Sequence, residues 1–284
     1  MSLSDDVRAH CTAVAASARS VAIDRDALAA YDAQPAAHID PELHELDGDP
    51  EAVARGLLTL DSINFGSGWF PTLRKDPGRS GYATIARAVK EHGPWSNEEL
   101  RAMTAPSIAA VLRQPADHEL IALYAQALRA LGRWLGERTV LEATRAPCAQ
   151  ALAAALADAM PAFADRGFYK RAQIVPSNLA LAGVASYPDL DRLTIFADNL
   201  VPHVLRCDGI LRYDPRLAAH IDAGRQLRRG PQEAEIRACA VVACEELSAH
   251  LGVAPRTLDS WLWNRGQGAR YKALPRHRCR CVYY

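Results

Sequence analysis

The chain has 284 residues, of which 49% are hydrophobic and 23% charged, and its 33 Lys and Arg residues balance its 33 Asp and Glu residues. This composition is that of a globular protein with one large domain or two packed halves, and it excludes a disordered chain. Zero net charge argues against a general nucleic-acid or membrane-surface binder, which needs a basic footprint. The sequence holds no apolar run of about 18 residues, so we expect no transmembrane helix and no membrane partner.

Helical periodicity dominates and predicts an all-α, mostly helical fold with few short strands at most. Residues 1–33 predict two helices, which either pack on the body or only drape over it. Residues 34–50 are rich in Pro, Asp and Glu and predict an acidic linker, and residues 51–284 form the main helical domain of one compact unit. The clearest helices are expected at residues 120–135, 147–164 and 231–251, with Pro161 beginning or ending one. Short strands are expected at 193–196 and 280–284.

The cysteines favour a reducing, cytoplasmic location, because they are seven in number and scattered along the chain. His277, Cys279 and Cys281 alternate as a metal-binding segment can, but no second ligand pair accompanies them, so we expect no metal. After Asp259 the chain carries no acidic residue and several basic ones. This tail is either a solvated end or an anion site for a phosphate.

Two segments combine aromatic and polar residues. In residues 60–71, Phe65 lies among hydrogen-bonding side chains, a combination that suits a flat heterocycle but is more often found at a helix end closed by glycines over a core. In residues 167–174, Lys170 and Arg171 follow two aromatic residues. They either hold a phosphate or form a solvated charged face.

Two further segments contain carboxylates in apolar surroundings. Asp198 lies within an apolar run, so it is paired, caps a helix beginning near residue 199, or is functional. In residues 257–264, Asp259 and Asn264 offer hydrogen bonds, while Trp261 and Trp263 offer stacking surfaces. The alternative for this segment is an amphipathic helix with its Trp side chains in the core.

In this order, six segments resemble the queuosine salvage family, the queuosine 5′-phosphate N-glycosylases. They read LDSINFGSGWF, FYKRAQI, LTIFADNLVPHVLR, EIRACAVVACEEL, LDSWLWNRG and PRHRCRCVYY, from about Asp61 to the C-terminus. The resemblance implies an all-helical fold related to the helical DNA-repair glycosylases, with residues 51–284 as the catalytic domain. It implies hydrolysis of queuosine 5′-monophosphate to queuine and ribose 5-phosphate, which supplies queuine for tRNA modification. No cofactor or stable nucleic-acid partner is expected.

The resemblance also implies roles for individual residues. Asp198 matches the catalytic aspartate, as nucleophile, base or electrostatic stabiliser. The residues expected to bind the substrate are His44, Phe65, Phe196, Asp259, Ser260, Trp261 and Asn264. The candidates for the 5′-phosphate are Lys170, Arg171, Arg237 and His277. The sequence departs from the family pattern at Asn199, where animal members carry an aromatic residue, and at Asn264, where an acid is frequent.

Alternatives remain open at this point. Arg237 can instead pair with Glu233, four residues earlier on the same helix. The protein can also be a non-catalytic nucleobase- or tRNA-binding module on a glycosylase-like fold, or a helical scaffold whose aromatic residues all lie in the core.

Overall fold

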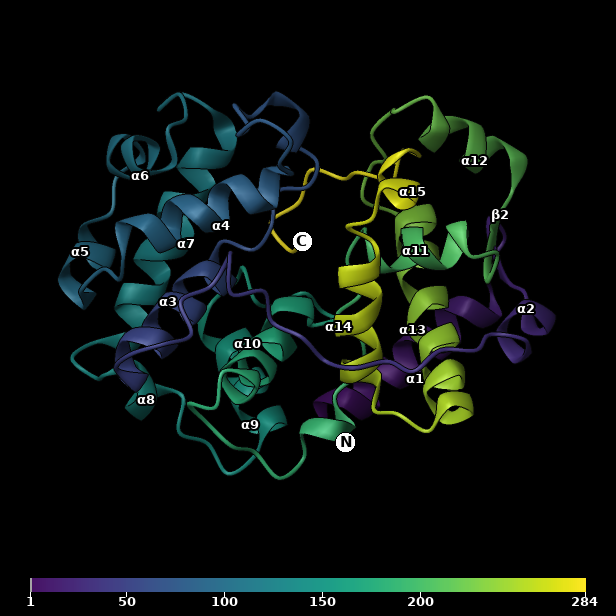
Figure 1. Cartoon of the computed structure of the whole chain (residues 1–284), viewed down its shortest axis with the longest axis horizontal. Coiled ribbons are helices and arrows are strands. Elements are labelled where there is room, and N and C mark those ends of the chain that lie inside the picture. Colours follow the sequence, from purple (N-terminus) through teal and green to yellow (C-terminus); the bar gives the residue numbers. More distant parts are fainter. Residues whose placement is uncertain (1) are drawn as a thin grey trace.

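The computed structural model describes residues 2–284 and consists of two helical halves that lie side by side (Figure 1). The first half contains α3 (Pro50–Ser62), α4 (Gly81–His92), α5 (Asn97–Ala102), α6 (Ala105–Leu112), α7 (Glu119–Leu135), α8 (Val140–Ala143), α9 (Ala149–Ala159) and α10 (Lys170–Leu181). The second half contains α1 (Leu3–Ala16), β1 (Val21–Ile23), α2 (Arg25–Ala29), α11 (Val201–Cys207), β2 (Leu211–Tyr213), α12 (Pro215–Asp222), α13 (Pro231–Leu251), α14 (Pro255–Arg265) and α15 (Ala269–Lys272). Single 3₁₀ turns lie at Phe70–Thr72 and Leu190–Arg192. The predicted all-α class is confirmed.

Each half has its own hydrophobic core. The core of the first half is formed by residues between Leu43 and Phe196, and that of the second by residues 7–28 together with residues 168 and 195–271. The N-terminal helices therefore pack on the body. Helix α1 lies against α13, with an ion pair of 2.8 Å between Arg8 and Glu245, and the Ser4 N–H donates to Gln150 of α9 at 2.9 Å.

The three clearest helix predictions correspond to α7, α13 and α9. The stripe of apolar residues on α7 is buried, and a left-handed glycine, Gly252, ends α13. Helix α9 ends at Ala159, two residues before Pro161, whose ring cannot follow the helix. None of the helices in residues 2–284 is both long and apolar enough to cross a membrane.

Both predicted strands are wrong, because side chains take the place of partner strands. The Thr194 N–H donates to the Gln173 side chain and the Phe196 N–H to Asp259. In the C-terminal tail, the Val282 carbonyl accepts from Arg171. The sheet that does form is the antiparallel pair β1–β2, with Ala22 opposite Arg212. These strands are only three residues long, too short for a clear alternating pattern.

Residues 34–49, which we call the strap, cross from the second half to the first in front of α14 (Figure 1). The strap is fixed at both ends. On α14, Ser260 Oγ accepts from the His38 N–H at 2.8 Å and donates to the His38 carbonyl at 2.9 Å. On α4, Lys90 Nζ donates to the carbonyls of Pro41 and His44 at 2.7 and 3.1 Å. The acidic linker expected from the sequence is thus tied to both halves.

Candidate active site

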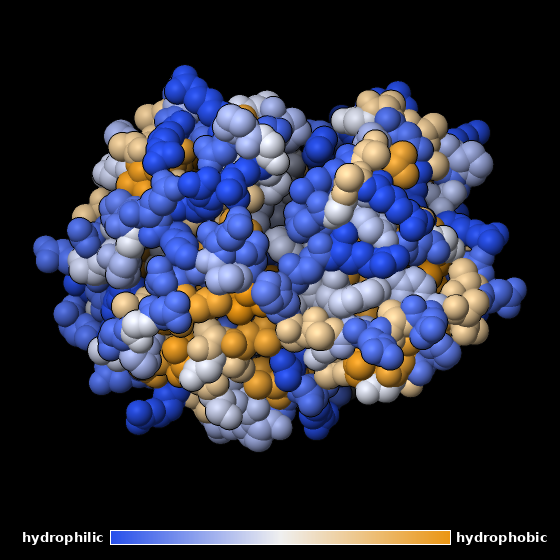
Figure 2. Space-filling view, in the orientation of Figure 1, coloured by the Kyte–Doolittle hydropathy of each residue, from blue (hydrophilic) through white to orange (hydrophobic). Residues whose placement is uncertain are grey.

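A groove of three adjoining pockets lies where the two halves meet. Figure 2 shows this face hollowed between the halves, with mostly hydrophilic residues at the rim. The strap pocket, of about 610 Å³, is lined by His38, Ile39, Asp40, His44, Asn64, Tyr82, Ile174, Ser177, Asn178, Leu181, Phe196, Asp259, Ser260, Trp263 and Asn264. The central pocket, of about 430 Å³, is lined by Asn64, Phe65, Ser67, Phe70, Ser80, Tyr82, Lys170, Asp198, Asn199, Leu200, Trp263, Gln267, Arg276 and Tyr284. The basic pocket, of about 630 Å³, is lined by Gly78, Arg79, Ser80, Gly266, Gln267, Tyr271, Lys272, Leu274, Arg276 and Arg278.

Shared residues make the three pockets continuous. The strap and central pockets share Asn64, Tyr82 and Trp263, and the central and basic pockets share Ser80, Gln267 and Arg276. The central pocket therefore lies between an aromatic and amide-lined compartment and a cationic one.

Asp198 lies in the central pocket, at the N-terminal end of α11. Its Oδ1 accepts from the backbone N–H groups of Leu200 and Val201 at 2.6 and 3.1 Å. Its Oδ2 receives no hydrogen bond from the described residues and is not enclosed by protein. Of the three alternatives left open by the sequence, the cap is present: one oxygen of Asp198 caps the first turn of α11, and the other oxygen is open to the central pocket.

Asp259 lies in the strap pocket on α14 and is bonded to the segment that carries Asp198. Its Oδ1 accepts from the Phe196 N–H at 2.8 Å. Burial and the neighbouring Asp198 charge raise the pKa of Asp259 to about 7, against the opposing effects of the Phe196 hydrogen bond and Lys170. A carboxyl group with a pKa near neutrality in a pocket is typical of a functional site.

Lys170 is a buried cation that faces the central pocket. Its Nζ donates to the carbonyl and side-chain oxygens of Asn64 at 3.2 and 3.1 Å. Burial lowers the pKa of Lys170 to about 8, while the charge of Asp198 raises it. The ammonium group is thus set between a neutral amide and the carboxylate region of the groove.

The strap brings His44 to the edge of the strap pocket. His44 Nδ1 lies 2.9 Å from the Asp40 carbonyl and Nε2 lies 3.3 Å from the Tyr82 hydroxyl. Burial lowers the pKa of His44, which favours the neutral ring. The Tyr82 ring in turn meets Trp263 edge to face at 5.5 Å. Ser260 and Asn264 line the same pocket while binding the strap at His38.

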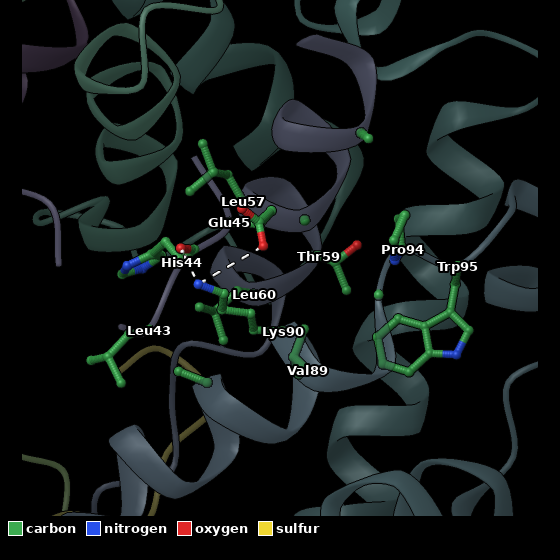
Figure 3. A pocket seen from close by; sticks show the side chains of 14 residues that line it. Leu43, His44, Glu45, Leu57, Thr59, Leu60, Val89, Lys90, Pro94 and Trp95 are labelled. Carbon is green, nitrogen blue, oxygen red and sulfur yellow. Dashed lines mark hydrogen bonds and ion pairs between the residues drawn. The ribbon is translucent and has the colours of Figure 1, made fainter. Parts of the chain in front are cut away.

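A separate apolar pocket of about 730 Å³ lies beside His44, between α3 and α4 (Figure 3). Leu57, Leu60, Val89 and Trp95 line it, and Lys90 reaches from its edge to the His44 carbonyl. It shares only His44 with the groove, so it plays no part in the site described here.

Three of the four expected phosphate ligands are enclosed by protein and line none of the three pockets of the groove. Arg171 donates to the carbonyls of Ser62, Ala162 and Val282, and thereby joins three segments of the chain. His277 is 2% exposed. Lys170 is the one candidate that lines the groove.

Arg237 is the third enclosed candidate, and it forms a buried ion-pair cluster. It pairs with Asp165 and, at 3.3 Å, with Glu233, the alternative partner considered from the sequence. Its Nε also donates to the Ala197 carbonyl at 2.9 Å. Arg237 therefore supports the backbone directly before Asp198.

The groove also contains residues that were not among the expected ligands. Trp263 lines two pockets, whereas Trp261 packs edge to face on Tyr31 at 6.3 Å, outside the groove. Helical spacing is the signal that could have separated them, because Trp263 lies four residues after Asp259 and shares its face of α14. Arg276, a half-buried cation between the central and basic pockets, was hidden among the basic residues of the tail.

The fold and the groove define a mostly helical protein in which an aromatic, amide-lined compartment adjoins a cationic one. The family model described as Queuosine salvage protein matches residues 43–284. A Sphaerobacter thermophilus protein named queuosine 5′-phosphate N-glycosylase/hydrolase is 34% identical over 94% of this chain and 94% of its own. Proteins of the same name from Nematostella vectensis and Mus musculus are 25% and 32% identical over 86% and 41% of this chain, and 85% and 40% of theirs. The chain belongs to the queuosine salvage protein family.

Proposed function

We propose that this protein hydrolyses the N-glycosidic bond of queuosine 5′-monophosphate and releases queuine and ribose 5-phosphate for queuine salvage. The observation that carries the proposal is the position of Asp198. Its carboxylate has one oxygen held by backbone N–H groups and one free oxygen, between a ring-binding and a cationic compartment. The names of the relatives support the same reaction.

The base occupies the strap pocket. Phe196 and Trp263 offer ring faces, and His44, Asn178 and Asp259 offer hydrogen-bonding groups. The ionised Asp259 accepts hydrogen bonds from the donor edge of the guanine-like ring. Ser260 and Asn264 act on the base mainly by holding the strap over it.

The ribose occupies the central pocket, beside Asp198 and Phe65. Breaking the bond between C1′ and the base nitrogen leaves its electron pair on the base and positive charge on the sugar. A carboxylate next to C1′ lowers the energy of that transition state, whether it attacks C1′, activates water or acts only by its charge. Water supplies the hydroxyl group at C1′ and the proton that the base takes up.

The 5′-phosphate lies at the junction of the central and basic pockets, where Arg276 and Gln267 line both. A guanidinium group binds a phosphate through two parallel hydrogen bonds. Lys170 also lines the central pocket, and its ammonium group offsets the negative charge of Asp198, Asp259 and the substrate.

We further propose that the enzyme works in the cytoplasm without a cofactor, a stable nucleic-acid partner or a membrane. The scattered cysteines and zero net charge of the sequence support this part.

The direct test is to incubate the purified protein with queuosine 5′-monophosphate and to detect free queuine by mass spectrometry. Release of queuine together with ribose 5-phosphate supports the proposal. Saturable binding without release, or tight tRNA binding that weakens steeply with salt, would favour the binding-module alternative.

A further inference from the structure

The basic pocket is larger and more highly charged than one phosphate group requires. With the solvent at its mouth included, the space inside it is about 630 Å³, against about 430 Å³ for the central pocket, which holds the sugar in the proposed function. Its lining contains four cations, Arg79, Lys272, Arg276 and Arg278, and no carboxylate. The pocket therefore continues well past the point at which Arg276 meets the central pocket.

Most of this positive charge has no counter-charge in the protein. Arg79 pairs with Glu42 at 3.6 Å, but among residues 2–284 no carboxylate forms an ion pair with Lys272, Arg276 or Arg278. Burial lowers the pKa of Arg276, the charge of Asp198 raises it, and the charge of Arg278 lowers it, so Arg276 and Arg278 repel each other. Such a cluster is stabilised when an anion enters.

The cations lie in sequence along the outward path from Asp198. Arg276 lines both the central and the basic pocket, whereas Lys272 and Arg278 line only the basic one. A ligand whose first phosphate meets Arg276 would therefore bring the next group along the chain to Lys272 and Arg278. The three unpaired cations exceed the charge of about −2 on a monophosphate.

We propose that the basic pocket is a subsite for a second phosphate group, attached on the 5′ side of the substrate nucleotide. Lys272 and Arg278 bind this second phosphate, while Arg276 keeps the first. The inference rests on the proposed function. The second phosphate belongs either to a nucleoside 5′-diphosphate or to the next phosphate toward the 5′ end of a short oligonucleotide with queuosine at its 3′ end. The reaction is unchanged: the bond from C1′ to the base breaks, water adds, and the phosphates stay on the sugar.

The test compares kcat/KM for queuosine 5′-monophosphate, queuosine 5′-diphosphate and a 5′-phosphorylated dinucleotide that ends in 3′ queuosine and so carries two phosphates. The variants are Lys272→Gln and Arg278→Gln. The matched control is Arg270→Gln. Arg270 is an exposed cation on α15, the helix that also carries Lys272, but its side chain lines none of the three pockets of the groove. We expect each test variant to lower kcat/KM about 10-fold for a substrate with a second phosphate and to leave the monophosphate unchanged.

The dependence on Lys272 and Arg278 identifies the source of the second phosphate. If the variants lower kcat/KM only for the diphosphate, the pocket binds nucleoside diphosphates. If they lower kcat/KM for the dinucleotide as well, the pocket binds the ends of degraded RNA. An equal loss for all three substrates, or no loss for any, overturns the inference while the proposed function stands.

Failure of the proposed function is detected separately, because the wild type then releases no queuine from any substrate. Calorimetric titration with inorganic pyrophosphate and with inorganic phosphate tests the subsite in that case. Pyrophosphate should bind the wild type more tightly than phosphate does, and Lys272→Gln should abolish the difference. Equal affinities in the wild type overturn the subsite.

Discussion

The Asp259 carboxylate accepts a hydrogen bond of 2.8 Å from the backbone N–H of Phe196, two residues before Asp198. Through this bond α14, which carries the proposed base ligand Asp259, also fixes the segment that carries the proposed catalytic residue Asp198. In the proposed reaction, recognition of the ring and placement of the carboxylate are therefore mechanically connected.

Replacing Asp198 by Asn should leave the fold intact and lower kcat by at least about 100-fold. The amide oxygen of Asn keeps the hydrogen bonds from Leu200 and Val201, whereas the charge that faces C1′ is lost. Turnover and thermal unfolding should be measured together. Asp198→Ala, the companion variant, also loses the cap and should unfold more easily by about 1 kcal/mol. Near wild-type turnover of Asp198→Asn would show that the catalytic role is misassigned.

The value of kcat/KM should rise with pH through about 7 and level off above it. Burial and the charge of Asp198 raise the pKa of Asp259 to about 7. Asp259 must be ionised in the free enzyme before its carboxylate can accept hydrogen bonds from the ring. The pH profile of Asp259→Asn should lack this step. If the step persists in the variant, it belongs to another group, such as the substrate phosphate, whose second pKa is about 6.

The free energy of unfolding should fall as pH rises from about 4 to about 7. In this window the folded protein still holds the Asp259 proton, whereas the unfolded chain, with a pKa near 3.8, has released it. Asp61, whose pKa is also raised to about 7 by burial, acts in the same direction. Urea unfolding at pH 4.5 and 7.5 measures the change. Asp259→Asn should reduce it, and an unaltered pH dependence in that variant would count against the raised pKa.

Arg276→Gln should raise KM for the monophosphate by about 10-fold to 100-fold and leave the free nucleoside largely unaffected. The reason is that Arg276 lines both the central and the basic pocket, at the junction where we propose that the 5′-phosphate binds. Steady-state kinetics with both substrates measures the loss of preference. An equal loss for nucleoside and nucleotide would mean that Arg276 acts on the sugar or on Asp198.

Arg237→Met should destabilise the protein by about 3–5 kcal/mol, because it leaves Asp165 and Glu233 buried without a counter-charge. Chemical unfolding measures this effect. If Arg237 were instead a phosphate ligand, the variant would keep its stability and lose the preference for the nucleotide. Asp165→Asn with Glu233→Gln in the same background should recover part of the lost stability.

The sequence predicts the helical class well, because stripes such as that of α7 repeat over many residues. It also singles out Asp198, because burying an unpaired carboxylate within an apolar run costs free energy unless the carboxylate is paired, caps a helix or has a function. Trp263 could have been found from its spacing to Asp259, but Arg276 could not. Which arginine of the tail reaches the groove depends on how the tail is held by Arg171 and against Gly68, whose missing side chain lets the backbone of Cys279 and Arg280 approach. The β1–β2 pair joins segments that are far apart in the chain, and a local sequence pattern cannot predict such a pairing.

The packing of α1 on α13 also sets an order of events during synthesis. Arg8 contacts Glu245, 237 positions later in the chain, so α1 leaves the ribosome long before α13, the helix on which it packs. The half built around α3 to α10 is complete before α13 exists, and it can close first. Until then the apolar face of α1, with Val7 and Cys11, is exposed. In a nascent chain of this protein, α1 is therefore the helix that most needs protection by a chaperone.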